Sequence, residues 1–249
     1  MDIGNQYGTL EMQKRLVRLL ESFHRFAIEN NIKYSLDWGS LLGAVRHKGF
    51  IPWDDDLDIM VDRENYNKIL KHIGGDLLIK HNTKEWLWID RIQFKDTDVD
   101  WKIPPTLDIF IIDNIPDSSI SRKIQIYGIL FITGMMKGWP QKGNLFQRFA
   151  LSIAHLFGLC IPWKTKMEWF HRFSQRWNNI ETEKKASYNT VYEDLSKVYS
   201  AEILDEVIEA PFENTVAFIT KDYHNSLVAK FGPDYMTPIY RAPIHIGKS

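Results

Sequence analysis

The feature that most constrains this chain is a run of acids that leads into a short apolar segment. Asp54, Asp55, Asp56 and Asp58 stand within five positions, and residues 59–61 are apolar. Side chains alternate between the two faces of a strand, so Asp56 and Asp58 would share one face. Two charges held that close repel unless a cation lies between them, and carboxylate oxygens suit Mg²⁺ or Mn²⁺. The run therefore predicts a strand at Leu57–Val61 that carries a divalent-metal site.

Upstream of the acids lies a segment with the features of a phosphate site. Gly39-Ser40 falls between a predicted strand, Ile32–Asp37, and a predicted helix, Leu41–Arg46. Glycine lets the backbone approach a phosphate, and a helix N-terminus offers free N–H groups. Three further candidate phosphate ligands follow in a row: Arg46, His47 and Lys48. Each pattern alone is ordinary, but together with the acids they favour phosphoryl or nucleotidyl transfer.

A third carboxylate would complete such a site. Asp108 is the first choice because it begins an apolar strand, Leu107–Ile112, that would lie beside the acidic strand. Asp113, at the far end of the same strand, is the second choice. A calcium loop of the EF-hand type is the main alternative for the acids, but Asn65 stands where its closing glutamate should be.

The remaining pattern predicts an α+β fold. Apolar residues from Leu16 to Ala27 recur at helical spacing, and Asn65–Ile73 forms a second helix that ends at a pair of glycines. Additional strands are expected at Leu77–Lys80, Trp86–Phe94 and Val99–Lys102. We expect a catalytic core in residues 1–116, a basic, aromatic helical insert in 117–185, and a C-terminal segment, 186–249, that completes the core with extended pieces and a helix near 222–231.

Charge is distributed unevenly along the chain. The net charge is −1, but residues 119–180 contain nine Lys or Arg and one acid, which gives +8 for this segment. Together with its tryptophans, this segment is typical of an interfacial membrane element, although it would also suit an ordinary helical subdomain that packs against acidic parts of the chain. No run approaches the ~20 apolar residues of a spanning helix. The lone Cys160 excludes an internal disulfide, and we find no nucleic-acid motif.

The run from Gly39 to Trp53 (GSLLGAVRHKGFIPW), followed by DDDLDI at residues 54–59, resembles the LicD family of phosphocholine transferases and, more distantly, the fukutin-related ribitol-phosphate transferases. Weaker likeness occurs at LDIF (107–110) and FGPDYMTP (231–238). Strong similarity covers residues 10–115, and residues 117–185 show none. The zinc-binding cysteines of the fukutin-related enzymes have no counterpart, since Cys160 is the only cysteine.

The resemblance implies a nucleotidyltransferase-like fold, a mixed sheet flanked by helices. It also implies transfer of a phosphoalcohol such as phosphocholine from a CDP-linked donor to a sugar hydroxyl of a cell-surface glycan, for example teichoic acid or lipopolysaccharide, with release of CMP. Asp56, Asp58 and Asp108 would be the catalytic and metal-binding acids. The candidate substrate-binding residues are Gly39, Ser40, Arg46, His47, Lys48, Trp53, Asp54 and Asp55. Trp53 adjoins the acids, where its ring would suit a quaternary ammonium group.

Two other functions stay open at this point. A nucleotidyltransferase would use the same acids but attach NMP to a small acceptor and release pyrophosphate. A degenerate glycan- or nucleotide-binding protein is the non-enzyme alternative, although all three acids are present.

We expect a cytoplasmic protein, at the inner face of the membrane if residues 119–180 contact lipid, with a glycan acceptor that is itself lipid-linked and no nucleic-acid partner.

Overall fold

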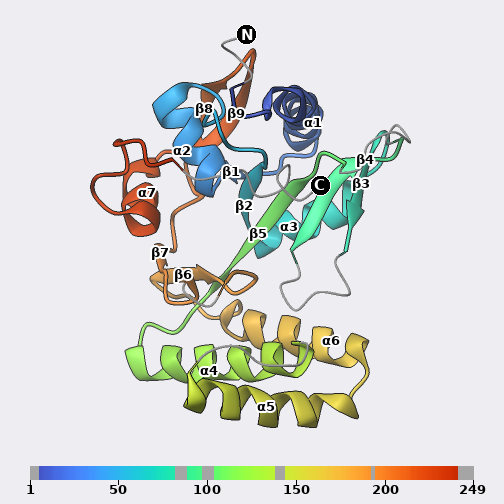
Figure 1. The fold of residues 1–249 in the computed structure, drawn as a ribbon, viewed down its shortest axis with the longest axis vertical. Coiled ribbons are helices and arrows are strands. Elements are labelled where there is room, and N and C mark those ends of the chain that lie inside the picture. The colour runs from blue at the N-terminus through green and yellow to red at the C-terminus, as the bar shows by residue number, and fades with distance from the viewer. Residues whose placement is uncertain (1–5, 82–88, 97–103, 138–143, 192–193, 241–249) are drawn as a thin grey trace. The chain divides into compact units, whose positions relative to one another are not determined.

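The computed structural model describes residues 6–81, 89–96, 104–137, 144–191 and 194–240 (Figure 1). The chain divides into two compact units. The first unit contains residues 1–80, 90–111 and 202–249, and the second contains residues 81–89 and 112–201. The mixture of helices and a largely antiparallel sheet agrees with the predicted α+β class.

The sheet of the first unit has the strand order β1-β2-β5-β4-β3. The strands are β1 Ser35–Leu36, β2 Asp58–Asp62, β3 Leu77–Lys80, β4 Asp90–Phe94 and β5 Leu107–Asn114. The pairs β1/β2, β3/β4 and β4/β5 are antiparallel. The predicted neighbourhood of the acidic strand and the strand of Asp108 is confirmed, because β2 lies next to β5.

Within its described residues, the first unit also contains four helices and a β-hairpin. They are α1 Leu10–Glu29, α2 Trp38–His47, α3 Arg63–His72, α7 Tyr223–Phe231, and the strands β8 Val207–Phe212 and β9 Thr215–Thr220. The apolar stripe of α1 is buried as predicted, with Leu19, Leu20, Phe23 and Ala27 fully covered. Helix α3 begins where the Asp62 carboxylate accepts a hydrogen bond from the Asn65 N–H (2.8 Å).

The hairpin β8–β9 was predicted only as extended pieces. Its two-residue turn is Glu213-Asn214, with Glu213 at φ 54°. This turn lacks the glycine that usually marks such hairpins, so the sequence signal is weak. Its position matters because Glu213 accepts a hydrogen bond from the Phe50 N–H (2.9 Å) and so fixes the loop that precedes the acids.

The second unit is mostly helical, as expected for this part of the chain. It contains α4 Ser119–Met136, α5 Leu145–Leu159, α6 Trp163–Ser174 and a 3₁₀ turn at Gln175–Trp177. The strand β6 Lys184–Ser187 pairs with residues 112–114 of β5, and β7 Tyr199–Ser200 pairs with β6. A separate apolar core that includes Ile129, Met135 and Phe170 holds this unit together.

Some boundaries differ from the predicted ones. The strand expected at Ile32–Asp37 is reduced to β1, and the acidic strand begins at Asp58, so that Asp56 precedes it. The strand expected at Val99–Lys102 and the start of the one at Trp86–Phe94 lie outside the described residues. The three-part division at residues 116 and 185 stays a prediction. Among the helices described, none combines the length and the apolar character needed to cross a membrane.

Candidate active site

Two neighbouring strands bring the predicted acids of the first unit together. Asp58 is the first residue of β2 and is buried, with 8% of its surface exposed. Its N–H donates to the Ser40 hydroxyl (2.9 Å), which ties β2 to α2. The Asp108 N–H, on β5, donates to the Leu57 carbonyl (2.8 Å). Asp58 and Asp108 therefore stand on adjacent strands near the start of β2.

The carboxylates act on one another electrostatically. Burial raises the pKa of Asp58 well above its ordinary value, and the charges of Asp56, Asp108 and Asp54 raise it further, while Arg91 lowers it. The pKa of Asp54 is raised from 3.8 to about 8, mainly by burial and further by the charge of Asp56 and a hydrogen bond with it. Four carboxylates thus share one weakly screened site, as is common where proteins bind cations or carry out catalysis.

Arg91 is a member of this site that sequence reasoning missed. It lies on β4 directly opposite Asp108, and its Nε is 3.0 Å from the Asp108 Oδ1. The Thr106 hydroxyl donates to the same oxygen (3.3 Å). Arginine opposite a carboxylate is a common cross-strand pair, but the register that makes them partners cannot be deduced from the sequence.

The nearby Asp54 carboxylate explains why a glycine stands at position 39. A Cβ on Gly39 would lie 2.3 Å from the Asp54 Oδ2, so only glycine lets this carboxylate approach α2 so closely. The backbone of Asp54 is also fixed, because the Gln13 side chain donates to its carbonyl (2.7 Å) and its N–H donates to the Ile51 carbonyl (2.8 Å). The loop before β2 is therefore held against both α1 and α2.

We predicted that Gly39-Ser40 precedes a helix, and this prediction is wrong. Helix α2 begins at Trp38, three residues earlier than predicted, with Asp37 as its N-cap residue. Both residues therefore lie in the first turn, and the Ser40 hydroxyl is engaged by the Asp58 N–H. The apolar residues after Ser40 suggested a later start, but Asp37 takes the N-cap position in an extended conformation, and its side chain makes no capping hydrogen bond.

A buried ion pair adjoins the acids and was not predicted. Lys230 of α7 donates to the Asp37 carboxylate, and the two side chains are 0% and 3% exposed. The Lys230 ammonium also lies 5.1 Å from the centre of the Trp38 ring. Burial lowers the pKa of Lys230 well below its ordinary value, while Asp37 favours the charged form. The Asp37 N–H donates to the Asp58 carbonyl (2.9 Å), so this pair supports the start of β2.

The predicted basic run lies at the other end of α2. Arg46 donates to the carbonyls of Tyr235 (2.9 Å) and Thr237 (3.4 Å), which fixes the C-terminal segment against α2. His47 and Lys48 are exposed, and Lys48 adopts a left-handed conformation that ends the helix. Arg46 thus has a structural role in this structure, and a phosphate contact by any of the three stays a prediction.

The remaining predicted residues are divided between the two units. Asp55 is buried (4% exposed), and Trp53 packs edge-to-face against Tyr7 and Tyr240, with ring centres 5.7 and 5.4 Å away. Asp113, the second choice for the third acid, belongs to the second unit, where it accepts a hydrogen bond from the Asn178 amide. Asp113 is not among the charges that act on Asp58, whereas Asp108 is.

The donor set of the acidic site fits a hard divalent cation by its chemistry. It consists of carboxylate oxygens on or next to rigid strands, with raised pKa values that a bound cation would reverse. As they stand, however, no three Asp, Glu, His or Cys side chains within the described residues are placed to hold an ion. Asp108 is turned to Arg91, and Asp54 to Asp56. Binding would require these side chains to exchange their present partners for the cation.

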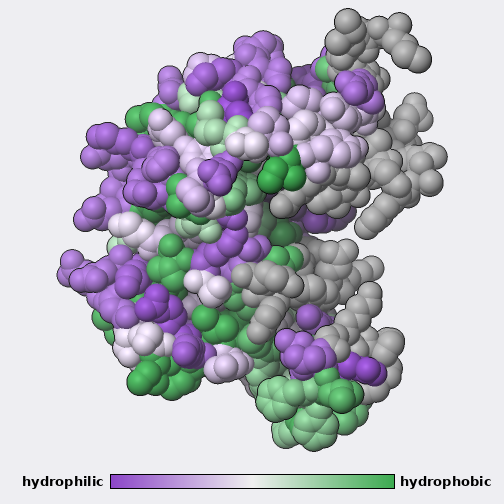
Figure 2. All heavy atoms as spheres, turned by 60° about the vertical axis from the view of Figure 1, so that its left-hand side comes forward, coloured by the Kyte–Doolittle hydropathy of each residue, from purple (hydrophilic) through white to green (hydrophobic). Residues whose placement is uncertain are grey.

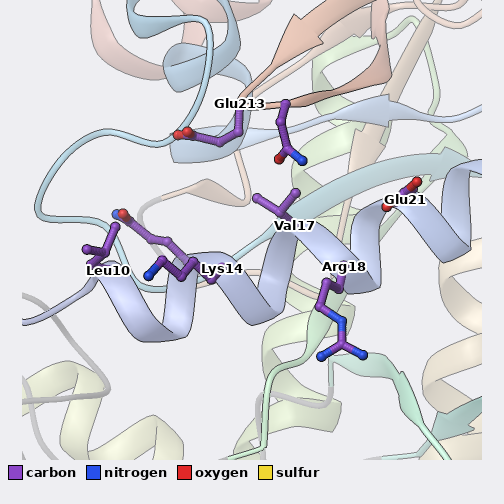
Figure 3. Close-up of a pocket in the computed structure, with 8 residues that line it drawn as sticks. Leu10, Lys14, Val17, Arg18, Glu21 and Glu213 are labelled. Carbon is purple, nitrogen blue, oxygen red and sulfur yellow. The ribbon is translucent and has the colours of Figure 1, made fainter. Parts of the chain in front are cut away.

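A pocket of about 220 Å³ lies elsewhere in the first unit, along α1 (Figure 3). Gln13, Lys14, Val17 and Arg18 form one wall, and Glu213 lies across from them. None of the predicted site residues lines it. We therefore place the candidate active site at the acids, because four neighbouring carboxylates are a stronger chemical signal than a cavity without such a cluster.

Comparisons with known proteins agree with this location. The family model described as the LicD/FKTN/FKRP nucleotidyltransferase domain matches residues 31–126, which include all the acids of the site. The lipopolysaccharide cholinephosphotransferase LicD of Haemophilus influenzae is 35% identical over 120 residues, which cover 43% of this chain and 45% of that protein.

Two rickettsial proteins of uncharacterised function are similar over shorter stretches. The Rickettsia typhi protein is 47% identical over 73 residues (27% of this chain, 23% of that protein), and the Rickettsia prowazekii protein is 52% identical over 50 residues (20% and 19%). The chain spans less than half the length of these curated relatives. Residues 31–126 are thus the part of this chain that is similar to the LicD family.

Proposed function

We propose that this chain is a metal-dependent phosphotransferase with a nucleotidyltransferase-like catalytic core. It would transfer a phosphoalcohol from a CDP-linked donor to a sugar hydroxyl of a cell-surface glycan and release CMP. The observation that carries the proposal is the buried Asp58, whose pKa is raised by Asp56, Asp108 and Asp54 in a segment that matches the LicD family. The similarity to a lipopolysaccharide cholinephosphotransferase supports the class of transferred group and of acceptor.

The proposed transfer is a single substitution at phosphorus, in which one bond forms and one breaks. The acceptor hydroxyl oxygen bonds to the phosphorus that bears the alcohol, the bond from that phosphorus to the bridging oxygen breaks, and CMP leaves with the bridging oxygen. A divalent ion held by Asp56, Asp58 and Asp108 would neutralise the charge of the pyrophosphate. The hydroxyl proton passes to a carboxylate, for which we propose Asp108, because its ion pair with Arg91 favours the ionised form, which is the form that can accept a proton.

The other residues of the site would orient these groups. Asp37 and Lys230 support the start of β2 through the Asp58 carbonyl, and Gly39 leaves room for Asp54. We propose that Trp53 and its neighbours Tyr7 and Tyr240 contact the alcohol of the donor, because aromatic faces attract a quaternary ammonium such as choline.

The test is CMP release from CDP-choline, CDP-ethanolamine, CDP-glycerol and CDP-ribitol, with Mg²⁺ or Mn²⁺ and with EDTA. We expect metal-dependent release from one donor and a loss of at least about 10²-fold in Asp56→Ala and Asp58→Asn. Asp62→Asn is the matched control, because Asp62 lies on the same strand but caps α3 and an asparagine can do the same.

Two results would contradict the proposal. An Asp56→Ala protein that keeps metal-dependent turnover would remove the acids from the mechanism. Pyrophosphate release from CTP or ATP, with no CMP from any CDP-alcohol, would assign the site to nucleotidyl transfer, which the same acids could serve.

A further inference from the structure

Helix α5 exposes an unusual number of large apolar side chains. Within the helix only Ala154 and Gly158 are buried. The exposed set includes Leu145 (83%), Phe146 (79%), Phe149 (66%), Leu156 (61%), Phe157 (67%) and Leu159 (65%). Single exposed apolar residues are normal, but a contiguous set of this kind marks an interaction surface. Figure 2 shows hydrophobic side chains gathered on the helices of the second unit, at the bottom of the view.

The neighbouring helix α4 extends the same surface. Ile120, Ile124, Tyr127 and Phe131 are exposed and recur at a spacing that places them on one stripe of the helix. The rings of Phe131 and Phe157 lie against each other, with centres 6.3 Å apart. The two stripes therefore form one apolar surface, which we call the α4–α5 surface.

The buried faces of α4 and α5 pack against each other. A Cβ on Gly158 would lie 2.4 Å from the Met135 carbonyl oxygen, and one on Gly134 would lie 3.0 Å from the Ala154 Cβ. The helices thus pack through small residues at close range, and Met135 and Ala154 belong to the core of the second unit. The apolar residues of the α4–α5 surface are additional to that core and point away from it.

The charges near this surface indicate the chemistry of what covers it. Residues 119–180 carry nine Lys or Arg against one acid, Glu168. Lys123 of α4, Arg148 of α5 and Lys164 of α6 are exposed. A partner that offers both apolar material and anions would therefore suit this surface and the exposed cations of its helices, as an anionic bilayer does. A second copy of this chain would bring the same cations together, which disfavours a symmetric dimer.

We propose that the α4–α5 surface docks on an anionic lipid bilayer, with its apolar side chains among the acyl chains and its cations at the headgroups. The length of α4, 18 residues or roughly 27 Å, and of α5, 15 residues or roughly 22 Å, suits helices that lie in the interface. The exposed Trp169 of α6 (41%) is of the type enriched at membrane interfaces. This proposal concerns the second unit and does not depend on the reaction proposed for the first.

The test is flotation of the full chain with vesicles of phosphatidylcholine alone or with one third phosphatidylglycerol. We expect binding to the anionic vesicles, a loss of binding at high salt, and at least about tenfold weaker partition for the triple variant Phe146→Ser/Phe149→Ser/Phe157→Ser, because burial of each ring favours the bound state. The matched control is Ile28→Ser/Leu70→Ser, two exposed apolar residues of the first unit.

Thermal melting of both variants separates binding from folding, because these side chains are exposed and their loss should leave the melting temperature unchanged. Equal binding by the triple variant and the control pair would overturn the proposal. A lack of wild-type binding to anionic vesicles would also overturn it. So would a dimer in sedimentation velocity that Phe149→Ser dissociates, since the surface would then bind a second copy of the chain.

Discussion

The acidic site and the α4–α5 surface depart from the usual distribution of residues in opposite senses. In the first unit carboxylates are buried, with Asp55 at 4% and Asp58 at 8% exposure. In the second unit large apolar groups are exposed, with Leu145 at 83%. Buried charge and exposed apolar surface are both unfavourable unless something compensates them. In the two proposals made above, a cation would compensate the first region and an anionic bilayer the second.

The largest expected effect follows from breaking the buried ion pair. Lys230→Met leaves the Asp37 carboxylate buried without its cation, and we expect it to lower the free energy of unfolding by about 3–5 kcal/mol. In contrast, Phe149→Ser in the α4–α5 surface should change it by less than about 0.5 kcal/mol. Urea titration followed by circular dichroism measures both variants.

The double variant Asp37→Asn/Lys230→Met is the control for the pair. With both charges removed, most of the lost stability should return, because an uncompensated charge is what destabilises the single variant. If the double variant is less stable than Lys230→Met alone, the loss comes from packing against Trp38, and the contrast between the two regions weakens.

A smaller effect is expected inside the helical hairpin of the second unit. Gly158→Ala would place a Cβ 2.4 Å from the Met135 carbonyl oxygen, which is backbone and cannot turn away. We expect a loss of about 1–3 kcal/mol from overpacking, despite the better helix propensity of alanine. Thermal melting checks this value.

Gly128→Ala is the matched substitution on α4. There the obstacle is the edge of the Phe173 ring, which can rotate, so the loss should be smaller. An equal or larger loss in Gly128→Ala would show that the close contact at Gly158 is not what holds α4 and α5 together. The apolar side chains of the α4–α5 surface would then be open to reassignment as part of the packing.

The sequence predicted the parts of the site that depend on local pattern. The acidic run, its strand and the adjacent strand of Asp108 follow from alternation and apolar composition, which are local properties. The pair of Asp37 and Lys230 could not be found this way, because 193 positions separate the two residues and a lysine on a short helix looks like a surface cation. Arg91 was missed for the same kind of reason, since its contact with Asp108 depends on strand register.

The second unit shows what helical periodicity alone does not predict. Helical periodicity in residues 117–185 was visible, and so was the excess of cations. Periodicity marks apolar stripes but does not say which of them face the core, and α4 has one stripe in the core and another exposed. Only the structure, with Gly134 and Gly158 at the helix contact, separates the packed face from the α4–α5 surface.

The smallest effect we predict is a pH dependence that originates at the acidic site. The pKa of Asp54 is raised to about 8, and that of Asp58 is raised as well, so the metal-free folded protein binds more protons there than the unfolded chain. Stability from these groups is therefore fully present below the unfolded pKa, near 4, and is lost as pH rises to the folded pKa. We expect the melting temperature of the metal-free protein to fall by a few degrees between pH 7 and 9.

Between pH 7 and 9, the effect of the acids on stability is separated from that of the histidines. The pKa of His24 is lowered by burial, so His24 affects stability below the ordinary value of 6.5 and with the opposite sign. Mg²⁺ competes with the protons, and it should raise the melting temperature more at pH 9 than at pH 7. Asp54→Asn should flatten the slope, whereas Asp62→Asn, outside the cluster, should not. A melting temperature that rises from pH 7 to 9 without metal would mean that the carboxylates are already ionised, and the buried charge of the first unit would then need no cation to explain it.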